Sequence, residues 1–328
     1  MSVKNKIVLA GGSGFLGRML FEHFGERGWE VVILSRSTKG LAHTVPWDGE
    51  TPGDWCDELE GATAVVNLAG RSVDCRYTAL NRRLIMNSRI RSTAVLGKAI
   101  ANCKVPPRVW LNSSTATIYR HSHVHPMDEW SGEIGATKAA KDAFSVKVAQ
   151  KWERAFSECE TPRTRKVVLR TAMVMGTEEG GVFRVLRRLT RLGLGGAMAG
   201  GLQFVSWIHE RDFCRALEWL VLKGDISGVV NLAAPNPLTN AEMMAAFRQS
   251  VGMPVGLQSA HWMLEVGAFL LRTETELIIK SRRAVPGRML RNGFRFQFEH
   301  FRAAIADLER RIDDSGSRVC IRSQEVFA

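Results

Sequence analysis

Three glycines near the start of the chain have the spacing of a loop that binds phosphate groups. Gly11, Gly14 and Gly17 stand in the segment KIVLAGGSGFLGRML, between an apolar run typical of a buried strand and an amphipathic helical pattern. At this spacing the glycines provide a tight turn, close approach of the backbone to a pyrophosphate, and close packing of the helix on the strand. The free N–H groups at the helix start then face the phosphates. The sequence therefore predicts a dinucleotide site formed by Gly11, Ser13, Gly14, Phe15, Leu16 and Gly17.

The end of the next strand predicts which dinucleotide is bound. A carboxylate at that place binds the 2′-hydroxyl of NAD, whereas an Arg accepts the 2′-phosphate of NADP. The segment WEVVILSRSTKG has Ser35 and Arg36 there and no carboxylate. Because a planar guanidinium suits a phosphate, we expect NADP(H) as the cofactor. The alternative is an Arg that merely lies exposed after a strand.

Strand-like and helix-like segments alternate from the start of the chain, as in a parallel sheet with helices on both faces. The expected strands are Lys6–Ala10, Glu30–Leu34, Ala64–Leu68, Arg108–Asn112, Lys166–Arg170 and Val229–Leu232. The expected helices are Phe15–Arg27, Leu80–Ala101, Ala140–Ser157, Cys214–Leu222 and one that Thr239 or Asn240 caps. We therefore predict an α/β fold, with a Rossmann-type doubly wound parallel sheet and a smaller mixed C-terminal substrate lobe.

The same pattern suggests the domain boundaries. Residues 1–176 form the predicted dinucleotide-binding domain, and its sheet is completed by residues 203–235. After residue 176 the pattern loosens into Gly-rich and turn-rich stretches, so residues 177–312 are assigned to the substrate lobe and a C-terminal extension. Residues 313–328 are expected to form a frayed tail.

Composition limits the classes of partner. The net charge of +12 and the pI of 9.8 could indicate nucleic acid, an anionic membrane or a polyanionic small molecule. The Lys and Arg residues are spread along the chain, which favours a solvated surface over a nucleic-acid site. The six cysteines form no CxxC pair and no Cys/His ligand spacing, so we expect neither a disulfide framework nor a metal site. The alternating His121, His123 and His125 fit a solvated loop.

No segment predicts export or insertion into a membrane. The first apolar run is too short for a signal peptide. The later stretch HWMLEVGAFLLR, residues 261–272, is interrupted by Glu265 and too short to span a bilayer. We expect a cytoplasmic protein that is not embedded in a membrane, and the sequence leaves open whether it forms an oligomer.

Motifs along most of the chain resemble those of the extended short-chain dehydrogenase/reductases, the family of nucleotide-sugar epimerases and dehydratases. The closer resemblance is to its atypical epimerase group, family 39U. The matching segments are GGSGFLG at 11–17, VVNLAG at 65–70, NSRIRST at 87–93, NSSTATIY at 112–119, VVLRTAMVMG at 167–176, SWIHERD at 206–212, NLAAPNPLTNAE at 231–242 and VPGRMLRNGFRFQF at 285–298.

The resemblance implies roles for further residues. Leu68, Ala69 and Gly70 would lie against the adenosine half of the cofactor, and Arg89 would meet a ribose or phosphate oxygen. Thr115 would be the catalytic hydroxyl that hydrogen-bonds the carbonyl or alcohol of the substrate. The alternatives are that residues 68–70 form only a tight turn after the strand, that Arg89 faces solvent, and that the hydroxyl of Thr115 bonds its own backbone.

The family also uses a Tyr-x-x-x-Lys pair for proton transfer, and this sequence lacks it. Alignment on Glu153 puts Ser145 and Ala149 at the two places, and Lys147 is expected to be solvated. The substitute proton donors are Tyr119, which we take as the catalytic candidate, Tyr77 with Arg76, and His209. Possible substrate contacts at the mouth of the cleft are Ser72, Arg76, Trp207 and His209, and Asp212 is expected to cap the helix that follows.

Three function classes remain. The first is an NADP(H)-dependent oxidoreductase or epimerase-like enzyme that acts on an unidentified small molecule. The second is a catalytically weak NADP(H)-binding sensor, which the missing Tyr/Lys pair favours. A nucleic-acid-associated protein is a third and weaker reading.

Overall fold

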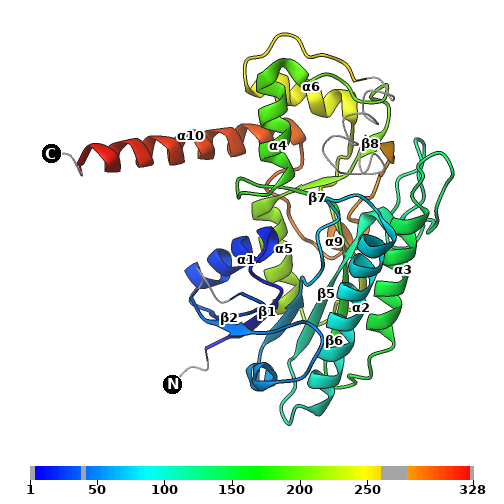
Figure 1. Cartoon of the computed structure of the whole chain (residues 1–328), viewed down its shortest axis with the longest axis vertical. Coiled ribbons are helices and arrows are strands. Elements are labelled where there is room, and N and C mark those ends of the chain that lie inside the picture. Colours follow the sequence, from blue (N-terminus) through cyan, green and yellow to red (C-terminus); the bar gives the residue numbers. More distant parts are fainter. Residues whose placement is uncertain (1–3, 38–41, 260–278, 326–328) are drawn as a thin grey trace.

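The central feature of the fold is a seven-stranded parallel sheet (Figure 1). The computed structural model describes residues 4–37, 42–259 and 279–325, with side chains described up to residue 314. The order of the strands is β10-β6-β5-β4-β1-β2-β3, so it reverses between β1 and β4. This confirms the predicted doubly wound sheet. The strands are β1 (Lys6–Ala10), β2 (Glu30–Ser35), β3 (Thr44–Pro46), β4 (Ala64–Asn67), β5 (Val109–Thr115), β6 (Arg165–Thr171) and β10 (Gly228–Leu232).

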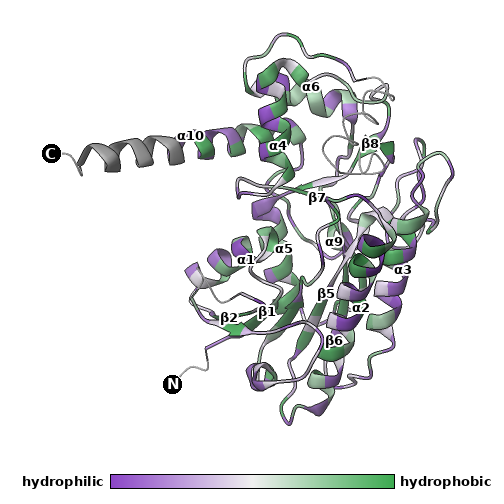
Figure 2. Cartoon of the chain, viewed as in Figure 1, coloured by the Kyte–Doolittle hydropathy of each residue, from purple (hydrophilic) through white to green (hydrophobic). Residues whose placement is uncertain are grey.

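Helices cover both faces of the sheet. Ile7 and Leu9 of β1 pack with α1 (Phe15–Glu26) and α5 (Glu210–Leu222) on one face. Val8 and Ala10 pack on the other face, which α2 (Ala79–Asn102) and α3 (Ala143–Ser157) cover. Figure 1 shows these two helix pairs on opposite sides of the strands, and Figure 2 shows the strands coloured as hydrophobic. Burial on both faces explains the continuous apolar strands.

The start of α5 differs from the prediction. The helix begins at Glu210, four residues before the expected start, and His209 is its N-cap, with Nδ1 accepting the backbone N–H of Arg211 at 3.1 Å. Asp212 is therefore not the cap, and that prediction was wrong. Its carboxylate instead accepts the backbone N–H groups of Gln297 at 2.9 Å and Phe298 at 2.8 Å.

A smaller lobe of short elements follows the sheet. It contains two strand pairs, and its core includes Phe183, Trp207, Phe247 and Phe301. Thr239 caps α6 (Asn240–Ser250) in a capping box with Glu242, which confirms one of the two predicted caps. The remaining elements of the described residues are β7 (Met173–Met175), α4 (Val182–Leu189), η3 (Thr190–Leu194), β8 (Phe204–Val205), β9 (Trp207–His209), β11 (Leu238–Thr239), α6 (Asn240–Ser250), α9 (Gly287–Arg291) and α10 (Phe301–Glu325), with the short 3-10 helices η1 (Asp54–Leu59) and η2 (Ala116–Ile118).

The C-terminal segment is more helical than predicted. Helix α10 continues to Glu325, whereas a frayed tail was expected after Asp313, and it extends away from the body of the molecule (Figure 1). A single Gly inside a helix costs only about 1 kcal/mol, so Gly316 does not end it. The apolar stretch 261–272 lies outside the described residues. In the described part of the chain, no helix combines the length and the apolar composition that a membrane crossing requires.

Candidate functional site

The loop after β1 has the shape that its glycines predict. Gly11 has a φ of +77°, and a Cβ there would lie 2.7 Å from the Cα of Ala69, so the loops after β1 and β4 touch. A Cβ on Gly17 would collide with the carbonyl group of Gly12. A Cβ on Gly14, by contrast, would meet no atom within 4 Å. The loop thus leaves open space at Gly14, where a pyrophosphate can approach the backbone, and the residues present fit such a group.

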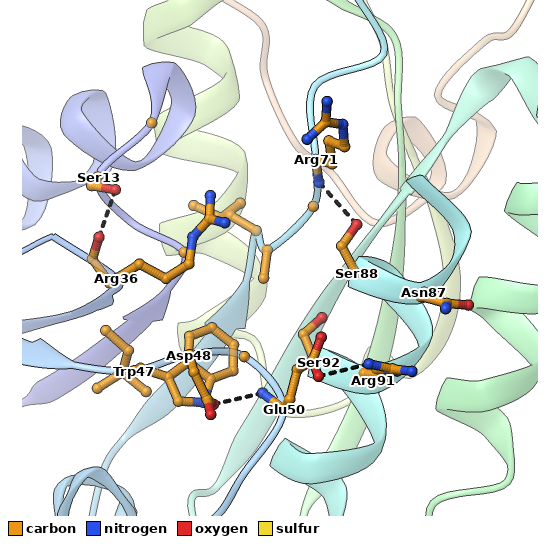
Figure 3. Close-up of a pocket in the computed structure, with 18 of the residues that line it drawn as sticks. Ser13, Arg36, Trp47, Asp48, Glu50, Arg71, Asn87, Ser88, Arg91 and Ser92 are labelled. Carbon is orange, nitrogen blue, oxygen red and sulfur yellow. Dashed lines mark hydrogen bonds and ion pairs between the residues drawn. The ribbon is translucent and has the colours of Figure 1, made fainter. Parts of the chain in front are cut away.

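A first cavity of 420 Å³ opens above this loop, at the point where the strand order reverses (Figure 3). Eight of the predicted cofactor residues line it: Gly11, Ser13, Gly14, Ser35, Arg36, Leu68, Ala69 and Gly70. The hydroxyl of Ser35 donates to that of Ser13 at 2.8 Å, which joins the loops after β1 and β2. The exposed side chain of Arg36 points into the cavity (Figure 3). This is the place that a 2′-phosphate would need.

The opposite rim of the first cavity was not predicted from the sequence. It consists of the segment 47–50 after β3 and of one side of α2, which includes Asn87, Ser88 and Arg91. The two carboxylates on this rim are engaged: Asp48 accepts the backbone N–H groups of Glu50 and Thr51, and Glu50 pairs with Arg91 at 2.7 Å. The helical spacing of the α2 residues could have predicted that they share one side of the helix. The three-residue strand β3 is too short to leave a pattern in the sequence, so segment 47–50 could not be placed.

A second cavity of 440 Å³ continues along the same edge of the sheet. Leu68 lines both cavities, so they adjoin. Thr115 reaches the second cavity from the end of β5, Ser145 from α3, and Leu16 from the start of α1. The hydroxyl oxygen of Thr115 accepts the backbone N–H of Thr117 at 3.1 Å. The residue thus bonds its own turn, as the alternative reading expected, while its O–H can still donate to a ligand.

A buried ion pair supports the end of β5. Glu153 of α3 accepts two hydrogen bonds from Arg170 of β6, at 2.8 and 2.7 Å, and a third from the hydroxyl of Ser114 at 2.6 Å. Burial alone would lower the pKa of Arg170, but its hydrogen bonds to Glu153 and the charge of Glu153 raise it above its ordinary value. Because Ser114 precedes Thr115, this network fixes the position of the candidate catalytic hydroxyl.

Comparison with known proteins identifies the family. Residues 7–233, more than half of the chain, match the family described as the NAD dependent epimerase/dehydratase family. The chain belongs to this family. Residues 261–308 match a second family, described as a domain of unknown function (DUF1731).

Relatives of this epimerase family cover almost the whole chain. The epimerase family protein SDR39U1 of Bos taurus is 32% identical over 311 residues, which are 92% of this chain and 99% of that protein. The Homo sapiens protein of the same name is 31% identical over 92% of this chain and 99% of its own length. YfhF of Bacillus subtilis (strain 168) is 29% identical over 92% of this chain and 97% of its own length. The resemblance to the 39U group of extended short-chain dehydrogenase/reductases is thereby confirmed.

Solved structures of epimerase proteins have the same fold. The crystal structure of the human epimerase family protein SDR39U1 (isoform 2) with NADPH has a TM-score of 0.82 and 28% identity, and the match covers 93% of this chain and 99% of that one. The nucleoside-diphosphate sugar epimerase of Corynebacterium glutamicum has a TM-score of 0.74 and 24% identity, over 94% of this chain and 58% of that one. The second likeness concerns the fold alone.

The positions of the epimerase family's Tyr-x-x-x-Lys pair are occupied by groups that cannot replace it. Ser145 lines the second cavity, but its hydroxyl is a weak acid at neutral pH. Ala149 is fully buried, and Lys147 is exposed, as predicted. Neither position supplies a cation to the cavity.

Arg89 of α2 supplies a cation from another direction. Its guanidinium donates to the carbonyl oxygens of Arg71 and Ile85, each at 3.0 Å, and lies 5.1 Å from the ring centroid of Trp152. No carboxylate in the described part of the chain pairs with it. Burial lowers the pKa of Arg89 to about 10, with Tyr77 acting in the opposite direction, so the side chain stays charged at pH 7. Arg89 lines the second cavity rather than the first.

The structure does not agree with Tyr119 as a proton donor. Its ring is buried, and its hydroxyl donates to Oδ1 of Asn231 at 2.8 Å, on β10. Burial raises the pKa of Tyr119, and the guanidinium of Arg170 lies 5.0 Å from its ring centroid. The residue lines neither cavity. It instead joins η2 to the far strand of the sheet.

The residues expected at the mouth of the cleft also lie elsewhere. His209 is fully buried and stacks on Phe298 with ring centroids 3.8 Å apart, and burial lowers its pKa to about 3. Trp207 is buried and donates to the carbonyl oxygen of Asn236. Ser72 and Arg76 line neither cavity. Of the three substitute donors, only Tyr77 lines the second cavity, beside Phe144 of α3.

Two residues of the predicted cofactor set have packing roles. The ring of Phe15 packs against Gly181, at the start of α4, and Gly17 allows α1 to approach Gly12. Neither residue lines a cavity. Among the described residues, no group of three or more His, Cys, Asp or Glu side chains is arranged to hold a metal ion.

Proposed function

We propose that the protein is an NADP(H)-dependent oxidoreductase or epimerase-like enzyme that acts on a small molecule. The observation that carries the proposal is the side chain of Arg36, which points into a cavity based on the glycine loop (Figure 3). That cavity adjoins a second one lined by hydroxyl groups. The crystal structure of the human relative with NADPH, 28% identical to this chain, supports the same cofactor. When bound, NADPH would supply a hydride from nicotinamide C4 to a carbonyl carbon.

Each part of the two cavities has a proposed task. The N–H groups at Ser13 and Gly14 hold the pyrophosphate, Arg36 holds the 2′-phosphate, and Leu68 to Gly70 lie against the adenosine half. Thr115 donates to the substrate oxygen, where negative charge develops. Arg89 takes the place of the missing lysine as the cation of the site, and Tyr77 is the remaining candidate for the proton donor. We assign residues 1–176 to the cofactor domain, whose sheet is completed within residues 203–235, and the rest of residues 177–312 to the substrate lobe and C-terminal extension.

Replacing Arg36 tests the choice of cofactor. Arg36→Ala is expected to weaken NADPH binding by about 10- to 100-fold, because a charge-assisted bond to phosphate is lost, and to change NADH binding by less than about threefold. Titration calorimetry with each coenzyme measures both constants. Arg154→Ala, an exposed position on α3, is the control and should bind both coenzymes as the wild type does. If Arg36→Ala weakened the binding of NADPH and NADH equally, Arg36 would not be the residue that binds the 2′-phosphate.

Replacing Thr115 tests the chemical role. Thr115→Val keeps the shape of the side chain but removes the hydroxyl, and we expect NADPH oxidation to slow by about 10- to 1000-fold. NADPH affinity should stay within about threefold, because Thr115 lines only the second cavity. Tyr77→Phe is the companion variant, with slower turnover and unchanged NADPH affinity expected. Unchanged turnover in either variant would exclude that residue from the mechanism.

A second candidate function is a sensor of the coenzyme's redox state. It is favoured by Ser145 and Ala149 at the positions of the proton-transfer pair. A sensor must bind NADPH and NADP⁺ with different affinities and show no turnover. Equal affinities, or turnover that Thr115→Val abolishes, would exclude it.

A further inference from the structure

Three hydroxyl groups of the second cavity are available to a ligand. Ser113 and Thr115 stand two residues apart on β5, so their side chains lie on the same face of the sheet, and Ser145 reaches the cavity from the first turn of α3. Among the described residues, no protein group pairs with the hydroxyls of Ser113 and Ser145, and that of Thr115 can still donate. Because β5 and α3 pack together, these groups suffice for one carbonyl oxygen, which has two lone pairs.

Most other polar side chains of the lining are engaged by the protein. The pairs are Ser114 with Glu153, Thr117 with the guanidinium of Arg282, Trp152 with Thr93, Thr171 with the carbonyl oxygen of Leu169, and Ser206 with that of Arg282. In the part of the chain that the structure describes, no Asp, Glu, Asn, Gln or His side chain lines the cavity. A nucleotide sugar carries many hydroxyl groups, each of which needs a partner when it is buried. It would therefore leave polar groups unpaired here.

The two cations of the lining also have partners. Nη1 of Arg282 donates to the hydroxyl of Thr117 at 3.1 Å. Arg89 donates to two carbonyl oxygens and lies beside Gly70, where a Cβ would be 3.1 Å from the Cζ of Arg89. Because Gly70 lines the first cavity, we expect the phosphates of the coenzyme to provide the counter-charge of Arg89. A neutral substrate leaves both guanidinium groups with the partners that they have.

The walls of the cavity are apolar. They are formed by side chains from the loop after β4 and from α1, α2, α3, β7 and α4, namely Leu16, Leu68, Val73, Ile85, Phe144, Val148, Met173 and Val182. The ring of Phe144 packs edge-on against that of Tyr77, with centroids 4.9 Å apart, which fixes one aromatic wall. Such a lining stabilises an apolar body by removing it from water. The part of the substrate beyond its carbonyl group should therefore be hydrocarbon.

We propose that the substrate is a neutral, mainly hydrocarbon aldehyde or ketone, whose oxygen is bound by the hydroxyl groups at the end of β5 and the start of α3. The inference rests on the proposed function, because it names the substrate class of the same site. In the reduction, the carbonyl carbon gains the hydride that NADPH loses. The C=O electron pair moves to the oxygen, which takes up one proton that is supplied in the end by water. The carbonyl compound becomes an alcohol, and the coenzyme becomes NADP⁺.

A series of ketones tests the substrate class by varying the hydrocarbon at constant carbonyl chemistry. The protein is first titrated with NADP⁺, and the saturated protein is then titrated with hexan-2-one, heptan-2-one and octan-2-one. We expect the affinity to rise about two- to fourfold for each added CH₂ group, which is the usual effect of burying it. Three further compounds should bind more weakly than octan-2-one: 7-oxooctanoate, which adds a carboxylate to a chain of the same length, erythrulose, an open-chain ketone with three hydroxyl groups, and UDP-glucose.

Two variants of α4 locate the effect. Val182→Asn places an amide group in the apolar wall and should weaken the binding of octan-2-one by at least about fivefold. Val185→Asn is the matched control, because this exposed residue of the same helix lines neither cavity, and it should bind octan-2-one as the wild type does. NADP⁺ affinity should stay unchanged in both variants. Thermal unfolding checks that both are folded, and the ketone series on the wild type depends on neither variant.

Several results would overturn the inference: no rise in affinity along the ketone series, tighter binding of 7-oxooctanoate, erythrulose or UDP-glucose than of octan-2-one, or a folded Val182→Asn variant that binds octan-2-one as the wild type does. Failure of the first titration would instead reject the proposed function, since no NADP⁺ would bind. The ketones would then be compared on the apoprotein, where the dependence on chain length should remain, and its absence would reject the inference as well.

Discussion

Gly17→Ala is expected to weaken NADPH binding by at least about 100-fold and to lower the free energy of unfolding by about 1–3 kcal/mol. A Cβ at this position would collide with the carbonyl group of Gly12, which is backbone and cannot move alone. The loop and the start of α1 must therefore shift apart. Overpacking costs stability, and a displacement of about 1 Å is enough to remove a bound group from its partners. Calorimetry with NADPH and urea unfolding measure the two effects.

Gly25→Ala is the matched control for this prediction. Gly25 lies in the same helix, and a Cβ there would meet no atom within 4 Å. Replacing Gly by Ala in a helix is expected to raise the free energy of unfolding by about 0.5–1 kcal/mol without changing NADPH binding. If Gly17→Ala binds NADPH as tightly as Gly25→Ala does, the glycine loop does not hold the pyrophosphate.

Glu153→Leu is expected to destabilise the fold by about 3–5 kcal/mol, because it leaves the buried guanidinium of Arg170 without its counter-charge. The double variant Glu153→Leu/Arg170→Met should cost less than the single one, since no buried charge then remains. Urea unfolding gives both values. Glu158→Leu, which breaks the exposed ion pair with Arg154 on the same helix, should leave the free energy of unfolding nearly unchanged. A double variant less stable than the single one would show that the network stabilises the fold by more than charge pairing.

The rate of NADPH oxidation should also depend on the ion pair between Glu153 and Arg170. The hydroxyl of Ser114 donates to Glu153, and Thr115 follows Ser114 at the end of β5. The folded fraction of Glu153→Leu is therefore expected to bind NADPH with unchanged affinity but to oxidise it more slowly.

The parts of the fold that depend on local patterns could be predicted from the sequence. Buried parallel strands are continuous apolar runs, and the glycine spacing places a tight loop between β1 and α1. Both signals are contained within segments of a few residues. The remaining strands of the sheet were therefore not needed to locate Gly11, Gly14 and Arg36.

The parts that depend on contacts distant in sequence could not be predicted. Arg282 reaches the second cavity because the segment before α9 folds back onto Thr117, 165 residues earlier. Tyr119 is the last residue of the motif NSSTATIY, but the turn η2 directs its hydroxyl to Asn231 on β10. His209 lies in a motif with charged neighbours, yet the pairing of β9 with β7 buries it under Phe298. A motif gives the residue type, whereas the direction of the side chain depends on the tertiary fold.

The measurement that tests the central claim most directly is a calorimetric titration of the pure apoprotein with NADPH and, separately, with NADH. The account predicts saturable binding of NADPH, and binding of NADH that is weaker by about 10- to 100-fold because the 2′-phosphate is missing. No heat with either coenzyme, or NADH bound as tightly as NADPH, would contradict it.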